Sequence, residues 1–284
     1  MPPCFFIFGF GYTAEYFAQK LTKFNCKIIG TTRDEEKIRK QNSPNYQLIH
    51  FLDPALSTHL KSATHILVST PPSAEGDPVL SHYVDTLKTL KSLQWLGYLS
   101  STSIYGDHQG RWVNELSSSL TPGIQGQLRI LAEKAWMNFS KQFNLPLQIF
   151  RLAGIYGPQR NALLRLQAGK PYSIYKEGQF FSRIHVEDLV RLLYLASQTP
   201  KAFEIFNLSD DEPAAPHLVD AYASSLLNHP ALPLVPYEKA ELSPMEKEFY
   251  ANNRRVSNAK IKEALTLELI YPSYREGLKA LLKS

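Results

Sequence analysis

Two glycines and an alanine near the start of the chain have the spacing of a turn that can hold phosphate groups. Gly9, Gly11 and Ala14 form the pattern G-x-G-x-x-A directly after an apolar run. In dinucleotide-binding proteins the first glycine permits a tight turn, the second lets a pyrophosphate approach the backbone, and the small third residue lets a helix pack closely. The helix N-terminus would direct its N–H groups at the phosphates, which makes Tyr12 and Thr13 candidate binding residues. An ordinary strand–helix turn is the alternative, because glycines occur in turns of many kinds.

A second pair of candidates concerns which dinucleotide would bind. Thr32 and Arg33 lie about twenty residues beyond the glycines, where NAD-binding domains carry an acidic residue that accepts hydrogen bonds from the adenosine ribose. A carboxylate would repel a 2′-phosphate, whereas a hydroxyl and a guanidinium would bind one. The sequence therefore predicts NADP rather than NAD, with a solvated Arg33 at a strand end as the alternative.

Further polar candidates stand at the ends of predicted strands. Asp53 ends the third strand, where it could accept a hydrogen bond from an adenine amino group or cap the turn before Pro54. Ser69 and Thr70 end the fourth strand, and ligands of open α/β sheets bind at the carboxyl ends of strands. A hydroxyl-rich cluster, residues 101–107, follows the fifth strand and could be either a hydrogen-bonded turn or part of a site.

These candidates need a parallel sheet to bring them together, and the hydrophobic pattern predicts one. Short apolar runs bounded by turn residues indicate buried strands, and amphipathic segments between them indicate helices. The predicted strands cover residues 4–10, 25–33, 46–53, 63–70, 96–100, 146–152 and 203–208. The main predicted helices cover residues 15–21, 78–92, 125–143 and 187–197. The third helix should bury Leu128, Leu131, Ala132, Ala135, Trp136 and Phe139.

The alternation of strands and helices predicts a doubly wound α/β fold of the Rossmann type, with a parallel sheet. We expect residues 1–155, with about 181–209 added, to form the NADP-binding domain. Residues 156–180 and 210–284 should form a small, discontinuous C-terminal substrate lobe.

Composition and charge argue against several other classes of protein. The chain has 284 residues, of which 44% are apolar, enough for a substantial core. No apolar run approaches the roughly 20 residues that span a bilayer. The net charge of +5 comes from scattered basic residues, which favours anionic small molecules over nucleic acid as partners. Cys4 and Cys26 lack the spacing of a metal site and suit buried thiols in a reducing compartment, so we expect a cytoplasmic protein without a metal.

Two segments beyond the fifth strand have a family pattern. Residues 151–158 read R-L-A-G-I-Y-G-P, and residues 181–189 read F-S-R-I-H-V-E-D-L. They are similar to the R-x-x-x-x-Y-G-P and I-H-V-x-D segments of the extended short-chain dehydrogenase/reductases, the NAD(P)-dependent epimerase/dehydratase group. The resemblance extends over essentially the whole chain. With G-x-G-Y-T at its start and G-I-Y-G-P-x-R-N at residues 154–161, the chain most resembles an atypical, poorly characterised bacterial subgroup.

The departures from the family pattern concern the active site. Typical members carry G-x-x-G-x-x-G at the first turn, whereas this chain has the shorter spacing. The family's catalytic Ser or Thr corresponds to Ser101, and the acid–base pair of its dehydratases is replaced at residues 102–103. The family's Y-x-x-x-K pair, aligned on Glu133, corresponds to Gln125 and Arg129.

These replacements change the chemistry that the resemblance implies. In the family the Tyr passes a proton, and the Lys lowers its pKa and holds the nicotinamide ribose. The amide of Gln125 cannot transfer a proton near neutral pH, but Arg129 could still bind the ribose and supply positive charge. Tyr105 is the nearest candidate for another proton carrier. A structural role for Tyr105 is favoured over a catalytic one, because the family's Tyr–Gly pair mainly shapes the turn.

The expected substrate lobe contributes candidates for substrate binding. Tyr156 and Arg183 lie in the two segments that resemble the family and are candidate substrate residues. Arg160, Asn161 and Arg165 could meet an anionic substrate, or they could form a solvated helix face.

The function implied by the resemblance is that of an NADP-binding oxidoreductase or isomerase of the epimerase and reductase type. It would act on a small polar substrate, nucleotide-linked ones included, with a non-standard active site that lacks the Tyr–Lys pair. The alternative is a non-catalytic NADP(H)-binding sensor or scaffold. We expect no nucleic-acid or membrane partner, and whether the chain forms a homodimer stays open.

Overall fold

The computed structural model describes residues 2–40, 43–199 and 203–283 and divides into two compact units. The first unit contains Met1–Ser100, Gln127–Arg151 and Val190–Phe206, and the second contains Ser101–Gly126, Leu152–Leu189 and Asn207–Ser284. The segments expected to form the substrate lobe all belong to the second unit, which also takes in residues 101–126, 152–155, 181–189 and 207–209.

The first unit is built on a seven-stranded parallel sheet with the order β11-β7-β5-β4-β1-β2-β3. Its strands are β1 Cys4–Phe8, β2 Lys27–Thr32, β3 Gln47–His50, β4 His65–Val68, β5 Trp95–Ser101, β7 Leu147–Leu152 and β11 Phe203–Leu208. The chain builds outward from β1 first in one direction and then in the other, so the strand order reverses between β1 and β4. Ligands of open α/β sheets bind at such a reversal. The predicted doubly wound α/β fold is confirmed.

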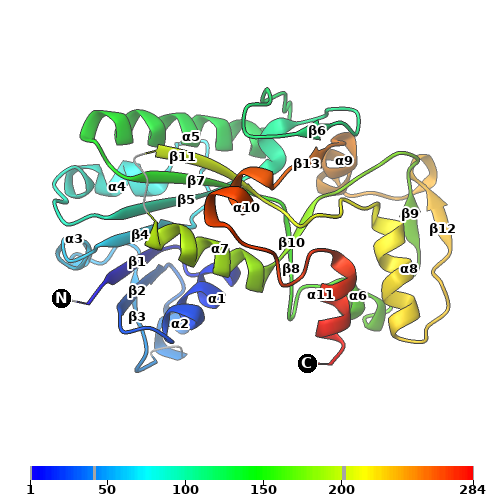
Figure 1. Ribbon diagram of the computed structural model, residues 1–284, viewed down its shortest axis with the longest axis horizontal. Helices are drawn as coiled ribbons and strands as arrows, with labels where there is room; N and C mark the ends of the chain where they lie inside the picture. Colours follow the sequence, from blue (N-terminus) through cyan, green and yellow to red (C-terminus); the bar gives the residue numbers. More distant parts are fainter. Residues whose placement is uncertain (1, 41–42, 200–202, 284) are drawn as a thin grey trace. The chain divides into compact units, whose positions relative to one another are not determined.

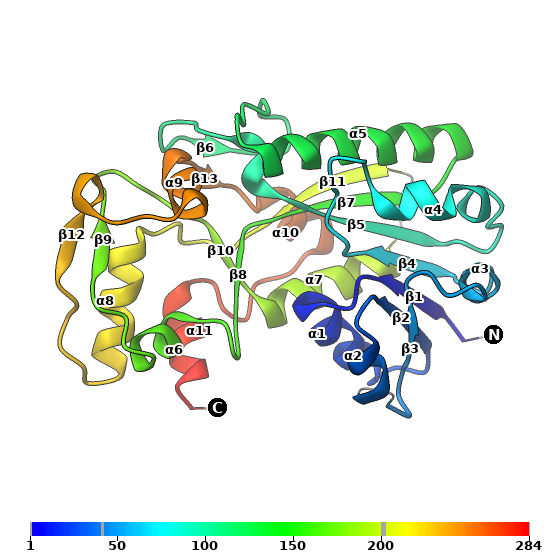
Figure 2. The same cartoon turned by 180° about the vertical axis from the view of Figure 1, so that it is seen from behind.

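Helices cover both faces of this sheet (Figures 1 and 2). α4 (Pro78–Leu87) and α5 (Ile124–Phe143) lie along one face, and α1 (Tyr12–Leu21) and α7 (Val186–Gln198) lie along the other. The short helices of this unit are α2 (Glu35–Lys40) and α3 (Leu56–Leu60). Because both faces are covered, every residue of β1 is buried and its sequence, CFFIF, shows no polar alternation.

Helix α5 begins one residue earlier than expected, and its buried face differs from the predicted one. Ala132 and Trp136 are buried as predicted, whereas Leu131 is 61% exposed and Ala135 is exposed as well. The prediction was wrong at these two positions because the buried stripe includes Glu133, whose charge is paired inside the unit. A hydrophobic pattern cannot assign a core position to a carboxylate.

The second unit has short elements around a core of its own. Its helices are α6 Ala162–Gln167, α8 Pro216–Leu226, α9 Pro244–Ala251, α10 Ala259–Leu265 and α11 Tyr274–Leu281. Its two-stranded parallel sheets pair β8 Gly154–Tyr156 with β10 Arg183–His185, β9 Ser173–Tyr175 with β12 Leu234–Pro236, and β6 Trp112–Val113 with β13 Arg255–Val256. Buried apolar side chains of α6, α8 and α11 form one cluster that holds these three helices together.

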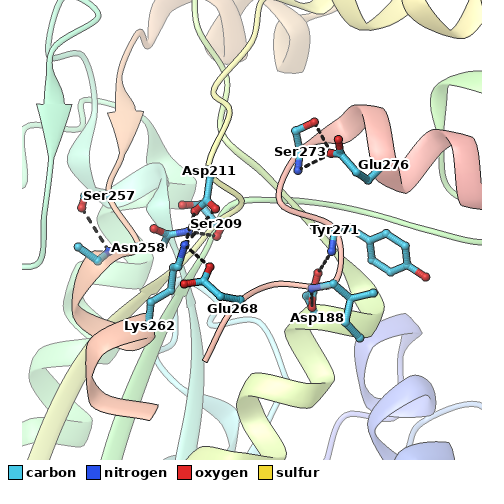
Figure 3. Close-up of polar contacts among 12 residues, drawn as sticks. Asp188, Ser209, Asp211, Ser257, Asn258, Lys262, Glu268, Tyr271, Ser273 and Glu276 are labelled. Atoms are coloured by element: carbon cyan, nitrogen blue, oxygen red, sulfur yellow. Dashed lines mark hydrogen bonds and ion pairs between the residues drawn. The ribbon is translucent and has the colours of Figure 1, made fainter. Parts of the chain in front are cut away.

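Polar contacts attach the C-terminal segment to the rest of the second unit (Figure 3). The Asp188 carboxylate accepts hydrogen bonds from the backbone N–H groups of Ile270 and Tyr271, each at 2.8 Å. Ser273 and Glu276 then form a capping box that starts α11. Asp188, which belongs to a segment that resembles the family, therefore has a structural partner near the end of the chain.

None of the helices in the described part of the chain is both long enough and apolar enough to cross a membrane. Within the same residues, no group of three or more His, Cys, Asp and Glu side chains is arranged to hold a metal ion. Cys4 is buried, Cys26 is half-buried, and both are free thiols.

Candidate functional site

A cavity of about 580 Å³ lies in the first unit, at the carboxyl ends of β1, β2 and β4, and we call it the β1 cavity. Most of the residues that the sequence suggests for dinucleotide binding line it, namely Gly9, Gly11, Thr32, Arg33, Ser69 and Thr70. They come from three segments that are far apart in sequence. The parallel sheet brings them together because the carboxyl ends of adjacent parallel strands meet at one edge.

The glycine turn forms one wall of the β1 cavity. Gly9 has φ +82°, and a Cβ there would lie 2.9 Å from the backbone nitrogen of Thr70, so only glycine fits. Gly11 differs, because a Cβ at this position would meet no heavy atom within 4 Å. Gly11 is also the N-cap of α1, and no side chain caps that helix. The turn thus offers backbone N–H groups and open space together, which suits a phosphate group.

Two threonine hydroxyls lie beside the glycine turn and in the lining of the β1 cavity. The Gly9 N–H donates to Thr31 Oγ1 at 3.1 Å, which ties the turn to β2. The Thr70 hydroxyl is buried in the lining of the cavity and has no hydrogen-bond partner. A buried hydroxyl without a partner is unfavourable, so a ligand that hydrogen-bonds to Thr70 would remove this cost.

Two cations lie at the rim of the β1 cavity. Arg33 is exposed there, and Lys37 of α2 also lines the cavity. The Lys37 ammonium forms an ion pair with Glu15 and donates to the Phe10 carbonyl at 2.6 Å, so it is held in place. Asp34 lines the same rim, but its Oδ1 accepts the Lys37 N–H at 3.0 Å near the start of α2. Sequence reasoning missed Lys37, although its position one helical turn beyond Arg33 was a usable signal.

Four of the suggested cofactor residues lie outside the lining of this cavity, namely Tyr12, Thr13, Asp53 and Arg129. The Tyr12 ring packs on Tyr16 with 5.0 Å between centroids, and Thr13 is buried. Asp53 Oδ1 accepts the Ala55 N–H at 2.7 Å, which is the turn-capping alternative that the sequence left open.

Arg129, the counterpart of the family's Lys, lies on α5 in the first unit. Its Nη1 donates to the Leu99 carbonyl at 2.7 Å and lies 3.4 Å from the Tyr98 hydroxyl. Burial raises the pKa of Tyr98, so this phenol stays protonated. Arg129 is therefore anchored at the carboxyl end of β5 as a fixed positive charge.

A buried ion pair one helical turn beyond Arg129 sets the position of α5. Glu133 Oε2 accepts from Arg151 Nη2 at 2.9 Å, and Oε1 accepts from Arg151 Nε at 3.2 Å and from the Ser100 hydroxyl at 2.6 Å. These contacts join α5 to β5 and β7. In the sequence, Glu133 serves only to place Gln125 and Arg129 in the family's pattern. Its partner Arg151 could not be identified without the fold.

Ser101 and Tyr105 belong to the second unit; Ser101 precedes the 3₁₀ turn Thr102–Tyr105, and Tyr105 is its last residue. Ser101 Oγ accepts the Ser103 N–H at 3.1 Å, and its own proton can still be donated. Tyr105 is fully buried, and its hydroxyl donates to Asn207 Oδ1 at 2.6 Å. This buried hydrogen bond holds the Tyr105 side chain in place, as a structural role of Tyr105 requires.

Gln125, the counterpart of the family's Tyr, is exposed at the start of α5. The next residue, Gly126, packs so closely that a Cβ would lie 2.5 Å from the Thr121 hydroxyl oxygen and 3.0 Å from the Ser103 carbonyl oxygen. The helix start is thus shaped for close packing on the turn after Ser101, although the phenol of the family is absent.

A second cavity, of about 780 Å³, lies entirely within the second unit beside α6, and we call it the α6 cavity. All of the suggested substrate residues line it, namely Tyr156, Arg160, Asn161 and Arg183. Arg165 and Lys170 line it as well. The segments that resemble the family therefore form one basic cavity.

Tyr156 and Asn161 form hydrogen bonds within the second unit. The Tyr156 hydroxyl donates to the Ser273 carbonyl at 3.2 Å. Asn161 Oδ1 caps α6 by accepting the Leu164 N–H at 3.0 Å, and its Nδ2 donates to the Gly157 carbonyl at 2.9 Å. Both ends of the Asn161 amide are thus engaged, and its contribution to the cavity is to hold the wall.

Arg183 is held in the wall of the α6 cavity by backbone groups. Its Nη1 donates to the carbonyls of Phe181 at 2.9 Å and Ala214 at 2.8 Å. Nearby Asp210 is 1% exposed, and burial raises the pKa of its carboxyl well above the ordinary value. Arg183 therefore keeps a fixed orientation, while the carboxyl beside it is a weak counter-charge.

The chain is similar to several known proteins. No family model matches it. It is 29% identical over 219 residues to the protein YeeZ of Escherichia coli K12, covering 71% of this chain and 76% of YeeZ. A solved structure described as a functionally unknown conserved protein from Silicibacter pomeroyi is 39% identical, with a TM-score of 0.91 and coverage of 99% of this chain and 98% of that one.

Structures of enzymes share the architecture at lower identity. UDP-glucuronic acid 4-epimerase from Bacillus cereus, solved with UDP-glucuronic acid and NAD, has a TM-score of 0.78 at 18% identity. The match covers 99% of this chain and 98% of the epimerase. At 18% identity, this similarity shows that the two proteins share a fold and nothing more.

Proposed function

The chain belongs to the same family as the functionally unknown protein from Silicibacter pomeroyi, and we propose that it binds a nicotinamide dinucleotide in the β1 cavity. It has the Rossmann fold of the NAD-dependent epimerases and dehydratases. The observation that carries the proposal is the lining of that cavity. Residues suggested by sequence spacing alone, from Gly9 to Thr70, converge there around an uncapped helix N-terminus.

The β1 cavity fits the group chemically. The pyrophosphate would lie over Gly11, where a side chain is absent and α1 supplies N–H groups. Thr70 would gain a partner for its buried hydroxyl. Once bound, the nicotinamide would supply the capacity to accept or donate a hydride.

NADP is the proposed form of the cofactor. Arg33 and Lys37 carry two positive charges at the rim, and Thr32, whose hydroxyl accepts the Asp34 N–H at 3.1 Å, lines the cavity with them. Charge-assisted hydrogen bonds from such groups are suited to a phosphate. Asp34 would oppose this preference less than a free carboxylate would, because it accepts a backbone N–H of α2.

The proposed activity is an epimerase- or reductase-type reaction on a small polar substrate. Ser101 would donate a hydrogen bond that polarises a carbonyl group, and Arg129 would supply a fixed positive charge for the ribose. Gln125 cannot transfer a proton, and the Tyr105 hydroxyl is engaged with Asn207. The proton would therefore come from the substrate or from water.

A non-catalytic NADP(H)-binding sensor is the second candidate, and the same two residues favour it. With an amide at position 125 and a buried phenol at Tyr105, the usual proton relay is missing.

Two measurements on the pure protein test these functions. Calorimetry with NADPH and NADH should give saturable binding that is tighter for NADPH. Incubation with NADPH and a metabolite library should then consume cofactor with one metabolite. Absence of dinucleotide binding would refute the proposal as a whole, and NADPH binding without turnover of any metabolite would favour the sensor.

A further inference from the structure

We propose that β6 is a docking edge for an extended, acidic segment of a partner protein. The segment would add to β6 as a strand and place an apolar side chain in the groove beside it. This interaction goes beyond the proposed function and does not depend on dinucleotide binding. A free strand edge, a groove with two exposed apolar side chains and two unpaired guanidinium groups support it.

β6 and β13 lie side by side (Figures 1 and 2), and the other edge of β6 has no partner strand in the described part of the chain. In this parallel ladder the Arg255 N–H donates to the Arg111 carbonyl at 3.0 Å. The Ser257 N–H donates to the Val113 carbonyl at 2.9 Å. Because successive backbone groups of a strand alternate in direction, the N–H and carbonyl of Trp112 point away from β13. No residue in the described ranges bonds to either group.

The outer edge of β13, in contrast, is covered by side chains. The Val256 N–H donates to Ser182 Oγ at 2.9 Å, and the Ser209 hydroxyl donates to the Val256 carbonyl at 3.0 Å. Unpaired backbone groups at a strand edge are a template for pairing with another strand. β6 is therefore the side of this small sheet to which a strand can be added.

A groove runs beside β6 within the second unit, and we call it the β6 groove. It consists of two cavities of about 450 and 340 Å³ that share Asn114 and Ser257 in their linings. Trp112 lines one end and Leu116 lines the other, and these residues are 54% and 94% exposed. The β6 groove shares no lining residue with the β1 cavity or the α6 cavity. Large apolar side chains exposed beside a groove are typical of a docking surface.

A hydrogen-bonded turn fixes Leu116 in its exposed position. The Leu116 N–H donates to Asn114 Oδ1 at 3.0 Å, and the Ser117 N–H donates to the Asn114 carbonyl at 3.0 Å. Glu115 Oε1 accepts the Asn207 N–H at 2.7 Å, which ties the turn to β11. Because this turn is already ordered, little conformational freedom is lost when a partner covers Leu116.

The Trp112 end of the β6 groove is positively charged. Arg111 is exposed, and its Nε donates to the His108 carbonyl at 3.1 Å. The Arg255 guanidinium lies 5.6 Å from the centre of the Trp112 ring and 4.8 Å from that of the Phe180 ring. Neither guanidinium forms an ion pair within the described residues. Carboxylates of a partner would therefore meet two unpaired cations here.

The charge at the Leu116 end differs. Its lining contains one cation, Lys260, and two carboxylates, those of Glu115 and Glu263. The acidic part of the partner segment would thus lie beside Trp112, and its apolar part beside Leu116. This difference between the two ends gives the docked segment a direction.

A single-stranded nucleic acid could also use an exposed indole and two cations. Its backbone has no N–H group to pair with the Trp112 carbonyl, and Glu115 and Glu263 would repel its phosphates. The free edge and the charges together therefore favour a peptide segment.

The exposed indole of Trp112 gives a direct readout of docking. The chain has three tryptophans, and Trp95 and Trp136 are fully buried, so acrylamide quenches mainly Trp112. The probes are the capped heptapeptide E-V-E-V-T-L-T and its reverse, T-L-T-V-E-V-E, because a strand can add in either direction. One of the two should bind and protect Trp112 from acrylamide. In that complex the Trp112 amide should exchange with deuterium at least about tenfold more slowly.

Substitutions in both partners locate the contact. Leu116→Ser should weaken peptide binding by about tenfold, and Arg111→Met should weaken it by about threefold. Both side chains are exposed, so the variants should fold. Leu131→Ser and Arg275→Met are the matched controls, because both residues are exposed and lie outside the β6 groove. The lysine peptide K-V-K-V-T-L-T should not bind measurably.

Several outcomes would overturn the proposal. These are no binding of either acidic peptide, equal binding of the lysine peptide, or binding that leaves Trp112 as open to acrylamide as before. Equal losses in Leu116→Ser and Leu131→Ser would place the peptide elsewhere on the chain. Protection of Trp112 by oligothymidine, but by neither acidic peptide, would make the β6 groove a nucleic-acid site instead.

Discussion

The β1 cavity and the α6 cavity are built in different ways. The first is organised around backbone features, namely glycines that leave space, a helix N-terminus and strand ends in one sheet, and side chains such as Phe10 and Phe51 complete its lining. The second is formed by long charged and aromatic side chains from segments scattered over the second unit. The difference teaches that a local motif can define a cofactor cavity, whereas a substrate cavity depends on which distant side chains the fold brings together.

The largest expected effect is on the backbone-built cavity. Gly11→Val should abolish NADPH binding, because a branched side chain would occupy the space that the pyrophosphate needs. The fold should survive, since a Cβ at Gly11 meets no heavy atom within 4 Å and its φ of −94° is open to any residue. Calorimetry and thermal unfolding measure the two effects.

Gly11→Ala serves as the graded control and should retain part of the affinity. A Val variant that is folded and binds NADPH as the parent does would show that the nucleotide does not lie on this turn.

The next effect concerns the scaffold of the first unit. Arg151→Met should lower the free energy of unfolding by about 3–5 kcal/mol, because it leaves the Glu133 carboxylate buried and unpaired. Urea unfolding measures the change. The double variant Glu133→Leu/Arg151→Met should recover part of the loss, since it removes both charges.

A loss below about 1 kcal/mol in the single variant would mean that Glu133 is not held as a buried ion pair. The position of Arg129 would then need another explanation than the anchoring of α5.

The choice between NADP and NAD should depend on side chains at the rim of the β1 cavity. Arg33→Ala should weaken NADPH by about 1.5–3 kcal/mol, the value of a hydrogen bond to a charged group, and leave NADH nearly unchanged. Lys37→Met should act in the same direction with a smaller effect, because Lys37 is already paired with Glu15. Calorimetry with both cofactors measures the difference.

Lys40→Ala is the matched control for Arg33, since Lys40 is an exposed cation outside the cavity lining that pairs with Glu36. Equal affinity of the parent protein for NADPH and NADH would rule out a 2′-phosphate site.

The smallest effect separates structure from catalysis in the second unit. Tyr105→Phe should lower the free energy of unfolding by about 1–3 kcal/mol, because Asn207 Oδ1 loses its buried donor. Turnover, once a substrate is found, should remain close to that of the parent. A loss of about 10²–10⁴-fold in turnover with unchanged stability would instead make Tyr105 the proton carrier.

Much of the first unit could be predicted from the sequence. The seven strands, the helices between them and most of the β1 cavity lining follow from apolar runs and from the spacing of Gly9 and Gly11. These features depend on residues close together in sequence, and a parallel sheet then has few ways to arrange its strand ends. Lys37 had a usable signal in its spacing from Arg33, but its contact with the cavity depends on the path of α2.

Other features depended on tertiary packing and had no local signal. The exposure of Leu131 and the burial of Glu133 reversed the order that hydrophobicity predicts, because the partner of Glu133, Arg151, lies on β7 and not on α5. The role of Asn161 as a cap could not be separated from substrate binding by residue type.

The sequence by itself determined the sheet and the phosphate-binding turn, because backbone dihedral angles and the hydrogen bonds of a helix end are decided by neighbouring residues. Tertiary structure alone decided which side chains have partners: Tyr105 with Asn207, Lys170 with Asp220, and the ring of Phe181 with that of Phe249. Such pairs join segments far apart in sequence. Their burial and charge compensation therefore arise only when the whole second unit has packed.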